Sequence, residues 1–282
     1  MMRWLMRHIL PVVAAGILSA GCASHSLNVI RPVREFHFDV AVNPCTRSEQ
    51  ADDQLTHPED VPFGMWSFEQ DGSAYLDNEK IVFSENGEWL PEVNKVWESE
   101  AEEMDFFAYS PHDRAEFDEE KGILIIGYDI DEGKDILYSR PLTVQKENST
   151  DRILINFNRA LTLVRFRVRV SAPDYVTITV KKIDVNGVYG KGDFQSLPEP
   201  AWNNHSEKRE ICFHDGSSEL YMIPQVSEMT VNLLCDIKSG EYELKDQTLS
   251  ANFTGYWKPG KISSYMVKID GSLNVSVEKD NE

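Results

Sequence analysis

The sequence predicts an all-β protein built from two β-sandwich domains in series. Short runs in which apolar and polar residues alternate recur along the chain, and Gly, Pro, Asn or Asp residues bound them. Stretches with helical periodicity do not exceed about three turns. The strands are therefore expected at residues 35–42, 80–83, 105–109, 123–128, 153–157, 164–170, 176–185, 211–213, 219–223, 230–237, 247–253, 264–269 and 273–277.

The clearest of these strands covers residues 164–170. Val164, Phe166 and Val168 alternate there with arginines, which is typical of a strand that buries one face and exposes the other. We expect the arginines on the solvent side.

A polar segment at residues 144–151 separates two series of predicted strands. It favours a domain boundary near residues 150–160. The N-terminal sandwich is predicted at residues 22–155, including the first strand at 35–42, and the C-terminal sandwich at residues 156–282.

The first 21 residues have the pattern of a secretory signal. Arg3 and Arg7 precede an apolar run at residues 9–20, which is about half the length of a membrane-spanning helix, so a signal is favoured over an anchor helix. Gly21 is followed by Cys22, which resembles the lipobox of bacterial lipoproteins. That resemblance implies acylation of Cys22 and attachment to a membrane.

The bulk composition indicates an exported globular protein. Of 282 residues 41% are apolar, which is enough to build one or two cores, and the formal net charge is −19. A surface this acidic disfavours nucleic acid and anionic lipid as partners. Acidic residues gather at 98–105 and 113–120, where we expect solvated loops rather than a cation site.

Three cysteines remain if Cys22 carries lipid. Cys212 and Cys235 lie in predicted strands and either form a disulfide or are buried as small apolar residues, and burial is favoured. Cys45 is the third. The spacing of the cysteines and histidines does not fit a zinc site.

The residues predict no catalytic, metal or cofactor site. Asp129, Asp131 and Asp135 superficially suggest a calcium loop, but Gly133 is out of register with the EF-hand spacing. The glycines at 187, 190 and 192 do not connect a buried strand to a helix, which excludes a phosphate loop. An enzyme is therefore not predicted.

Short motifs in a particular order resemble the fimbrillin-like (Mfa-like) lipoproteins, the subunits of type V pili in Gram-negative anaerobes. The resemblance covers nearly the whole mature chain and depends on the order of these motifs, which lie at residues 35–40, 46–47, 63–68, 106–111, 135–139, 155–161, 183–192, 221–225 and 257–261. Two features depart from the family pattern: Asn158 stands where His is common, and the tail after Ile269 is short and charged.

The resemblance implies two transthyretin-like β-sandwiches and a structural and adhesive role. In type V pili a lipidated precursor reaches the outer membrane, and an Arg-specific protease then removes the first strand. A strand from a neighbouring subunit fills the groove. The implied partners are other pilin subunits, the outer membrane through lipid on Cys22, and a host or bacterial adhesion target, at the cell surface or in the fimbrium.

On this sequence the implied cleavage site is Arg47-Ser48. The strand removed is 35–42, and its alternating residues Phe36, Phe38, Val40 and Val42 share one face. An ordinary loop arginine is the alternative interpretation of Arg47.

The candidate donor strand lies near the C-terminus, where Leu273, Val275 and Val277 alternate with polar residues. Its alternative role is a normal closing strand of the C-terminal sandwich. The residues do not predict whether the subunit lies at the base, shaft or tip of a pilus.

A binding protein of another class is the rival hypothesis. A surface lipoprotein that holds glycan or host protein without polymerising needs an exposed aromatic platform, and the candidate residues are Trp66, Trp89, Trp97, Trp202 and Trp257. Most of these are expected in the core, because aromatic residues at strand ends usually close sandwiches.

Overall fold

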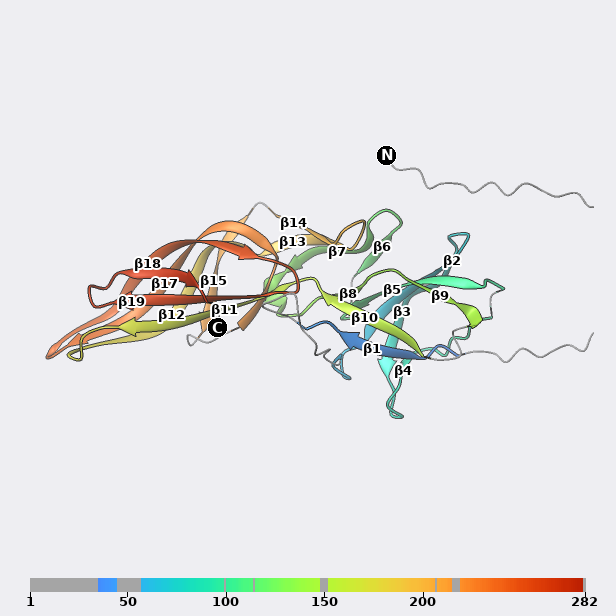
Figure 1. Ribbon diagram of the computed structural model, residues 1–282, viewed down its shortest axis with the longest axis horizontal. Helices are drawn as coiled ribbons and strands as arrows, with labels where there is room; N and C mark the ends of the chain where they lie inside the picture. The colour runs from blue at the N-terminus through green and yellow to red at the C-terminus, as the bar shows by residue number, and fades with distance from the viewer. Residues whose placement is uncertain are drawn as a thin grey trace, which may run out of the picture. The chain divides into compact units, whose positions relative to one another are not determined.

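The computed structural model describes residues 35–44, 57–98, 100–113, 115–147, 152–205, 207–214 and 219–280. The predicted all-β class is confirmed: the described residues form strands and short 3₁₀ turns, with no α-helix among them (Figure 1). Residues 33–282 make one compact unit. The signal at 1–21, Cys22, Arg47 and Ser48 lie outside the described residues. Within the described ranges we find no helix with the length and apolar character needed to cross a membrane.

Eight strands of the first half share one sheet. Its spatial order is β2-β3-β4-β1-β10-β8-β5-β9, and β2 also pairs with β5, so the hydrogen-bond ladder closes on itself. Closure matters because it pairs strand edges that an open sheet leaves free. The strands are β1 (Phe38–Val42), β2 (Phe63–Glu69), β3 (Ala74–Phe83), β4 (Trp89–Pro91), β5 (Glu103–Ser110), β8 (Leu137–Ser139), β9 (Leu142–Gln145) and β10 (Ile153–Arg159).

Two four-stranded sheets form most of the second half. One has the order β16-β11-β19-β20 and the other β15-β12-β17-β18. Figure 1 shows β12, β17 and β18 as the long strands of this half. The strands are β11 (Thr162–Ser171), β12 (Val176–Tyr189), β15 (Lys208–His214), β16 (Glu219–Met222), β17 (Gln225–Ser239), β18 (Tyr242–Trp257), β19 (Ile262–Asp270) and β20 (Val275–Lys279).

The alternation at residues 164–170 is only partly realised in β11. Val164 and Phe166 are fully buried, as predicted, and Arg165 and Arg167 are half-buried on the other face. Val168 is half-buried and Val170 is exposed, because this end of the strand extends past the packed part of the core.

A fourth sheet joins strands from both halves of the sequence. Its order is β14-β13-β7-β6, and its strands are β6 (Glu116–Asp118), β7 (Gly122–Asp129), β13 (Lys191–Gln195) and β14 (Ala201–Asn204). The antiparallel pairing of β7 with β13 places Ile125 opposite Phe194, and both side chains are buried. This ladder crosses the predicted boundary at residue 155.

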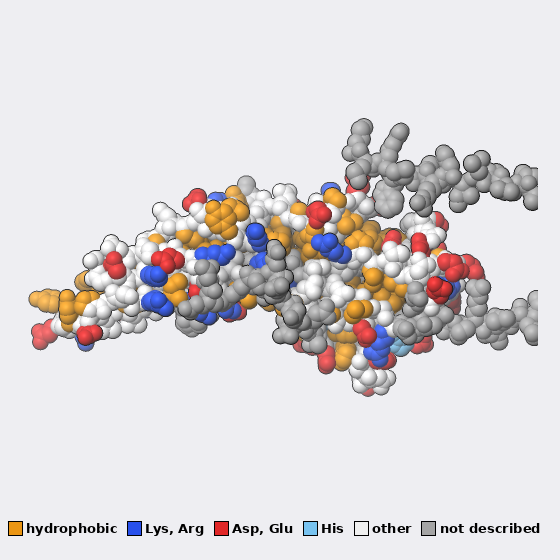
Figure 2. All heavy atoms as spheres, in the orientation of Figure 1, with side chains coloured by type: hydrophobic (Ala, Val, Ile, Leu, Met, Phe, Trp, Pro, Cys, Tyr) orange, Lys and Arg blue, Asp and Glu red, His pale blue; other side chains and the backbone are white. Residues whose placement is uncertain are grey.

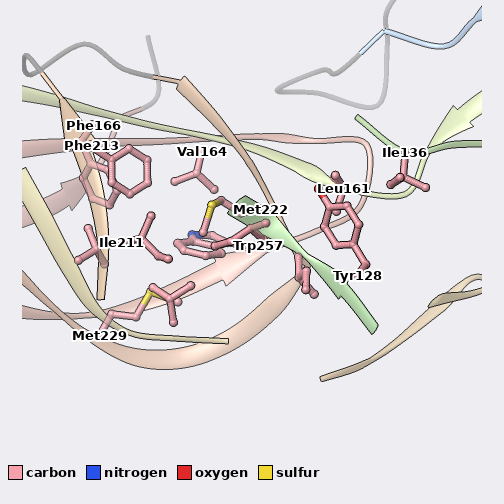
Figure 3. Close-up of a cluster of buried hydrophobic side chains, with 14 of the residues drawn as sticks. Tyr128, Ile136, Leu161, Val164, Phe166, Ile211, Phe213, Met222, Met229 and Trp257 are labelled. Carbon is pink, nitrogen blue, oxygen red and sulfur yellow. The ribbon is translucent and has the colours of Figure 1, made fainter. Parts of the chain in front are cut away.

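Two apolar clusters fill the interior. The smaller one lies inside the closed sheet and includes Phe36, Phe38 and Phe106. The larger one takes residues from both halves: Tyr128 and Ile136 belong to it together with Phe166 and Trp257 of the second half (Figure 3).

The two described cysteines do not form a disulfide bond. Cys235 is buried and Cys212 is half-buried, as the favoured alternative predicted. Their strands, β17 and β15, lie on opposite sides of β12, and Cys212 faces Asp184 while Cys235 faces Val180 across the ladders. A strand therefore separates the two thiols.

Candidate functional site

The first strand, β1, lies in the middle of the closed sheet. It pairs in parallel with β10 from Phe38 opposite Ile153 to Val42 opposite Phe157 (Figure 1). The ladder extends beyond both ends: the Ile153 N–H donates to the His37 carbonyl at 2.9 Å, and the Asn43 N–H donates to the Phe157 carbonyl at 2.8 Å. A chain segment near the N-terminus is thus an interior strand.

The other edge of β1 is held far less well. Only Phe38 pairs with β4, through Trp89. Further along, Glu35 bridges to Val96, and the Phe36 N–H donates to the Lys95 carbonyl at 3.2 Å. Most main-chain hydrogen bonds of β1 are therefore made on one side, with β10.

The side chains of β1 fill the small core. Phe36, Phe38 and Val42 are at most 3% exposed, and Val40 is half-buried. The Phe36 ring lies about 6 Å from four aromatic neighbours, namely Phe38, Tyr75, Trp97 and Phe106. Burial of three large apolar side chains stabilises the fold by roughly 5–9 kcal/mol in total. Loss of this strand would leave a deep apolar groove.

Charged groups line the outer face of β1, and Figure 2 shows acidic and basic side chains next to one another in this part of the molecule. Asp39 is exposed and lies 3.2 Å from Arg152, which also contacts Glu88. His37 is 3.6 Å from the same Glu88 carboxylate. Exposed pairs of this kind contribute at most about 1 kcal/mol each, so they are secondary to the apolar face.

His57 is buried in this core, and the sequence did not predict a role for it. Its ring is 3% exposed and packs against Phe63, Trp89 and Phe157. Nδ1 is 2.9 Å from the Pro58 carbonyl, which only accepts, so Nδ1 carries the proton and the neutral Nε2 accepts from the Ser110 hydroxyl at 2.8 Å. Burial, above all, lowers the pKa of His57.

A cavity of about 430 Å³ opens where β1 ends. Five separate segments line it, and the lining includes Asn43, Arg140, Asn158, Arg159 and Lys261. The Asn43 amide donates to the Asn158 side-chain oxygen at 2.8 Å, which gives the family-atypical Asn158 a structural partner. A neighbouring cavity of about 260 Å³ shares Asn43, Arg140 and Asn158.

Arg159 is the most enclosed cation at this cavity. It pairs with Asp135, donates to the Tyr221 hydroxyl at 3.1 Å and lies over the Tyr221 ring. The carboxylate of Asp135 therefore offsets the charge of Arg159.

The candidate donor strand forms an edge of a C-terminal sheet. Among the described strands β20 pairs only with β19, with Val277 opposite Val267, and Val275 and Val277 are half-buried. Leu273 lies outside the strand, in a turn where its φ is +65°. The prediction of a strand from residue 273 was therefore two residues too long at its start.

The three aspartates of the suspected calcium loop take part in local hydrogen bonds and ion pairs. Asp129 caps the 3₁₀ turn η1 (Ile130–Glu132), and both Asp129 and Asp131 contact Arg209. Asp135 pairs with Arg159. Among the described residues no group of three or more His, Cys, Asp or Glu side chains is placed to hold a metal ion.

The candidate tryptophan platform does not form. Trp66, Trp89, Trp97 and Trp257 are at most 7% exposed, and Trp202 is half-buried with its indole N–H bound to the Ala160 carbonyl at 2.7 Å. These residues are core, as expected for most of them.

Comparison with known proteins gives a family match and a shared fold. Residues 46–280 match the family model described as fimbrillin-like. A search of curated proteins finds no match. Three solved structures superimpose on most of the chain at low sequence identity, which indicates a common fold.

The first two of these structures are proposed cell adhesion proteins. The one from Bacteroides ovatus has a TM-score of 0.63 and 12% identity, covering 89% of this chain and 97% of its own. The one from Bacteroides uniformis has a TM-score of 0.59 and 14% identity, with coverage of 87% and 97%. A fimbrial protein from Bacteroides vulgatus has a TM-score of 0.57 and 13% identity, with coverage of 88% and 98%.

Proposed function

Because the chain belongs to the fimbrillin-like family, we propose that it is exported as a lipidated precursor on Cys22 and assembles into a fimbria by strand replacement. Its role in this proposal is structural and adhesive, without catalysis. The family is fimbrial, which implies the cell surface as its location and other pilin subunits as its partners.

The observation that carries the proposal is the position of β1. This strand fills the core with Phe36, Phe38 and Val42, yet its main chain has a continuous ladder on one side only. Arg47 follows Pro44, the last described residue after β1, by three positions. Cleavage after Arg47 would separate β1 from the rest of the chain and free the subunit from the lipid on Cys22.

The groove left by β1 suits an incoming strand. The edge of β10 would present the N–H and C=O groups that now pair with residues 37–43. Alternating pockets beneath would accept apolar side chains, as in other cases of strand addition.

The candidate donor is β20 of a neighbouring subunit. An edge strand with one ladder and half-buried valines loses less on leaving its sheet than an interior strand does. The rival role as a glycan-binding monomer is not favoured, since four of its five candidate tryptophans are buried.

The N-terminus of the protein on native cells tests this proposal. Mass spectrometry of the sheared surface fraction should find chains that start at Ser48 within detergent-resistant polymers. The Arg47→Ala variant should remain a lipidated monomer, whereas Arg34→Ala serves as the matched control because cleavage at residue 34 leaves β1 in place. An acylated Cys22 start with no shorter form would contradict strand replacement at Arg47.

A further inference from the structure

The cavity at the end of β1 is cationic. Arg140, Arg159 and Lys261 line it, and its lining residues include no Asp or Glu. Asp135 offsets Arg159, whereas no ion pair joins Arg140 to a carboxylate of the described part of the chain. Burial raises the pKa of the Tyr138 hydroxyl in the cavity wall. The positive charge of Arg140 lowers this pKa, and the negative charge of Glu199 raises it.

The direction of β1 makes this cavity the exit of the groove. β1 and β10 are parallel, and Asn43 and Pro44, which follow β1, form part of the cavity wall. A strand that replaces β1 in the same direction therefore delivers its next residues into the cavity.

The sequence of the candidate donor matches this geometry. When Val277 takes the position of Val42, Val275 and Leu273 fall at positions 40 and 38, which keeps three apolar side chains at two-residue spacing. Glu278 then falls at position 43 and Lys279 at position 44, the two positions of this segment that line the cavity, and Asp280 is the next residue in the sequence. The sequence continues with Asn281 and Glu282.

Charge complementarity favours this occupant. Two copies of a chain with a net charge of −19 repel each other on average, so an acidic strand end needs a local cationic site to be accepted. The cavity supplies such a site at the point where the acidic residues arrive.

We propose that this cavity is a socket for the carboxylates of residues 278–282 of a second copy of the chain, which fix the register of the incoming strand. The proposal rests on the strand replacement proposed above. It adds a register-setting site at the end of the groove to the apolar pockets beneath it.

A peptide exchange experiment tests the socket. Residues 46–49 of the full chain are replaced by the recognition sequence of a specific protease, so that opening of the groove does not depend on Arg47. A fluorescent peptide of residues 271–282 should bind the cut chain. A peptide with Glu278→Gln, Asp280→Asn and Glu282→Gln should bind about tenfold more weakly or worse.

Substitutions on the receiving chain complete the test. Arg140→Glu with Lys261→Glu should weaken binding of the wild-type peptide to a similar extent, and a peptide with Glu278→Lys and Asp280→Lys should restore it. Lys245→Glu, an exposed lysine on β18, is the matched control and should have no effect. Charge-swap rescue is not expected from a merely structural role of the two cations.

The outcomes separate the two proposals. Equal binding by the neutral peptide overturns the socket and leaves strand replacement standing. Equal binding by residues 278–282 alone also overturns it, because the cavity would then be a general anion site without a role in register. No binding by any peptide overturns the donor assignment and the socket together.

Discussion

The first and last described strands have opposite positions in the fold. β1 is an interior strand, parallel to β10, with three side chains buried in the small core. β20 is an antiparallel edge strand, and its apolar side chains are only half-buried. The fold therefore depends on the segment that is proposed to be removed much more than on the segment that is proposed to be donated.

Strand removal should give the largest contrast between the two. Excision of β1 through the protease site at 46–49 should lower the free energy of unfolding by roughly 5–9 kcal/mol and raise the fluorescence of an apolar-surface dye. Truncation after Gly271 should change the free energy of unfolding and the dye fluorescence far less. Urea denaturation and dye binding measure this, and equal effects of the two deletions would contradict the comparison.

Single substitutions should reproduce the contrast on a smaller scale. Phe38→Ala removes a ring that is 1% exposed and should cost about 3–5 kcal/mol, whereas Val277→Ala on β20 should cost about 1 kcal/mol. The exposed Ser276→Ala is the control and should stay within about 0.5 kcal/mol of wild type. A Phe38→Ala midpoint close to that of Val277→Ala in urea would show that β1 is not the more important strand.

The pH dependence of stability should report on the core that contains β1, because His57 is buried there. Burial lowers the pKa of His57 in the folded protein, so below about pH 6.5 the unfolded chain binds more protons than the folded chain. The free energy of unfolding therefore falls as the pH drops. The slope is up to about 1.4 kcal/mol per pH unit until the folded pKa is reached. His57→Gln should flatten this part of the profile. Thermal unfolding between pH 7 and 4.5 measures it, and parallel profiles for the two proteins would disprove the assignment.

The smallest effect is expected on the outer face of β1. Arg152→Ala removes contacts to Asp39 and Glu88 that are open to solvent, and should cost about 0.2–1 kcal/mol. The difference from wild type should shrink further in high salt, because mobile ions screen exposed pairs. A loss above about 2 kcal/mol in urea denaturation would mean that β1 is held by its charges rather than its apolar face.

The alternating pattern predicted which residues of a strand are buried, but not which strand is its neighbour. Phe36, Phe38 and Val42 were identified from spacing because one face of β1 is apolar, and the structure buries all three. The closure of β2 onto β5 and the pairing of β7 with β13 were not predicted, since period-two alternation contains no information about distant partners.

The site was predicted only where it lies on one segment. The cavity draws Asn43, Arg140, Asn158 and Lys261 from four places in the sequence, and no local pattern connects them. His57 is a lone histidine, with no motif around it. The start of β20 was detectable: Asp270 accepts from the main-chain N–H groups of Ser272 and Asn274, an Asp-Gly turn that keeps Leu273 out of the strand.

The parallel pairing of β1 with β10 also determines how the chain bears force. A pull applied before residue 35 draws β1 toward its own start, while the second half of the chain draws β10 toward its end. The two strands are then loaded in shear, so the register pairs from Phe38 to Val42 resist together instead of opening one at a time. Before any cleavage, the segment proposed to hold the precursor at the membrane is thus joined to the rest of the protein in the geometry that best withstands drag.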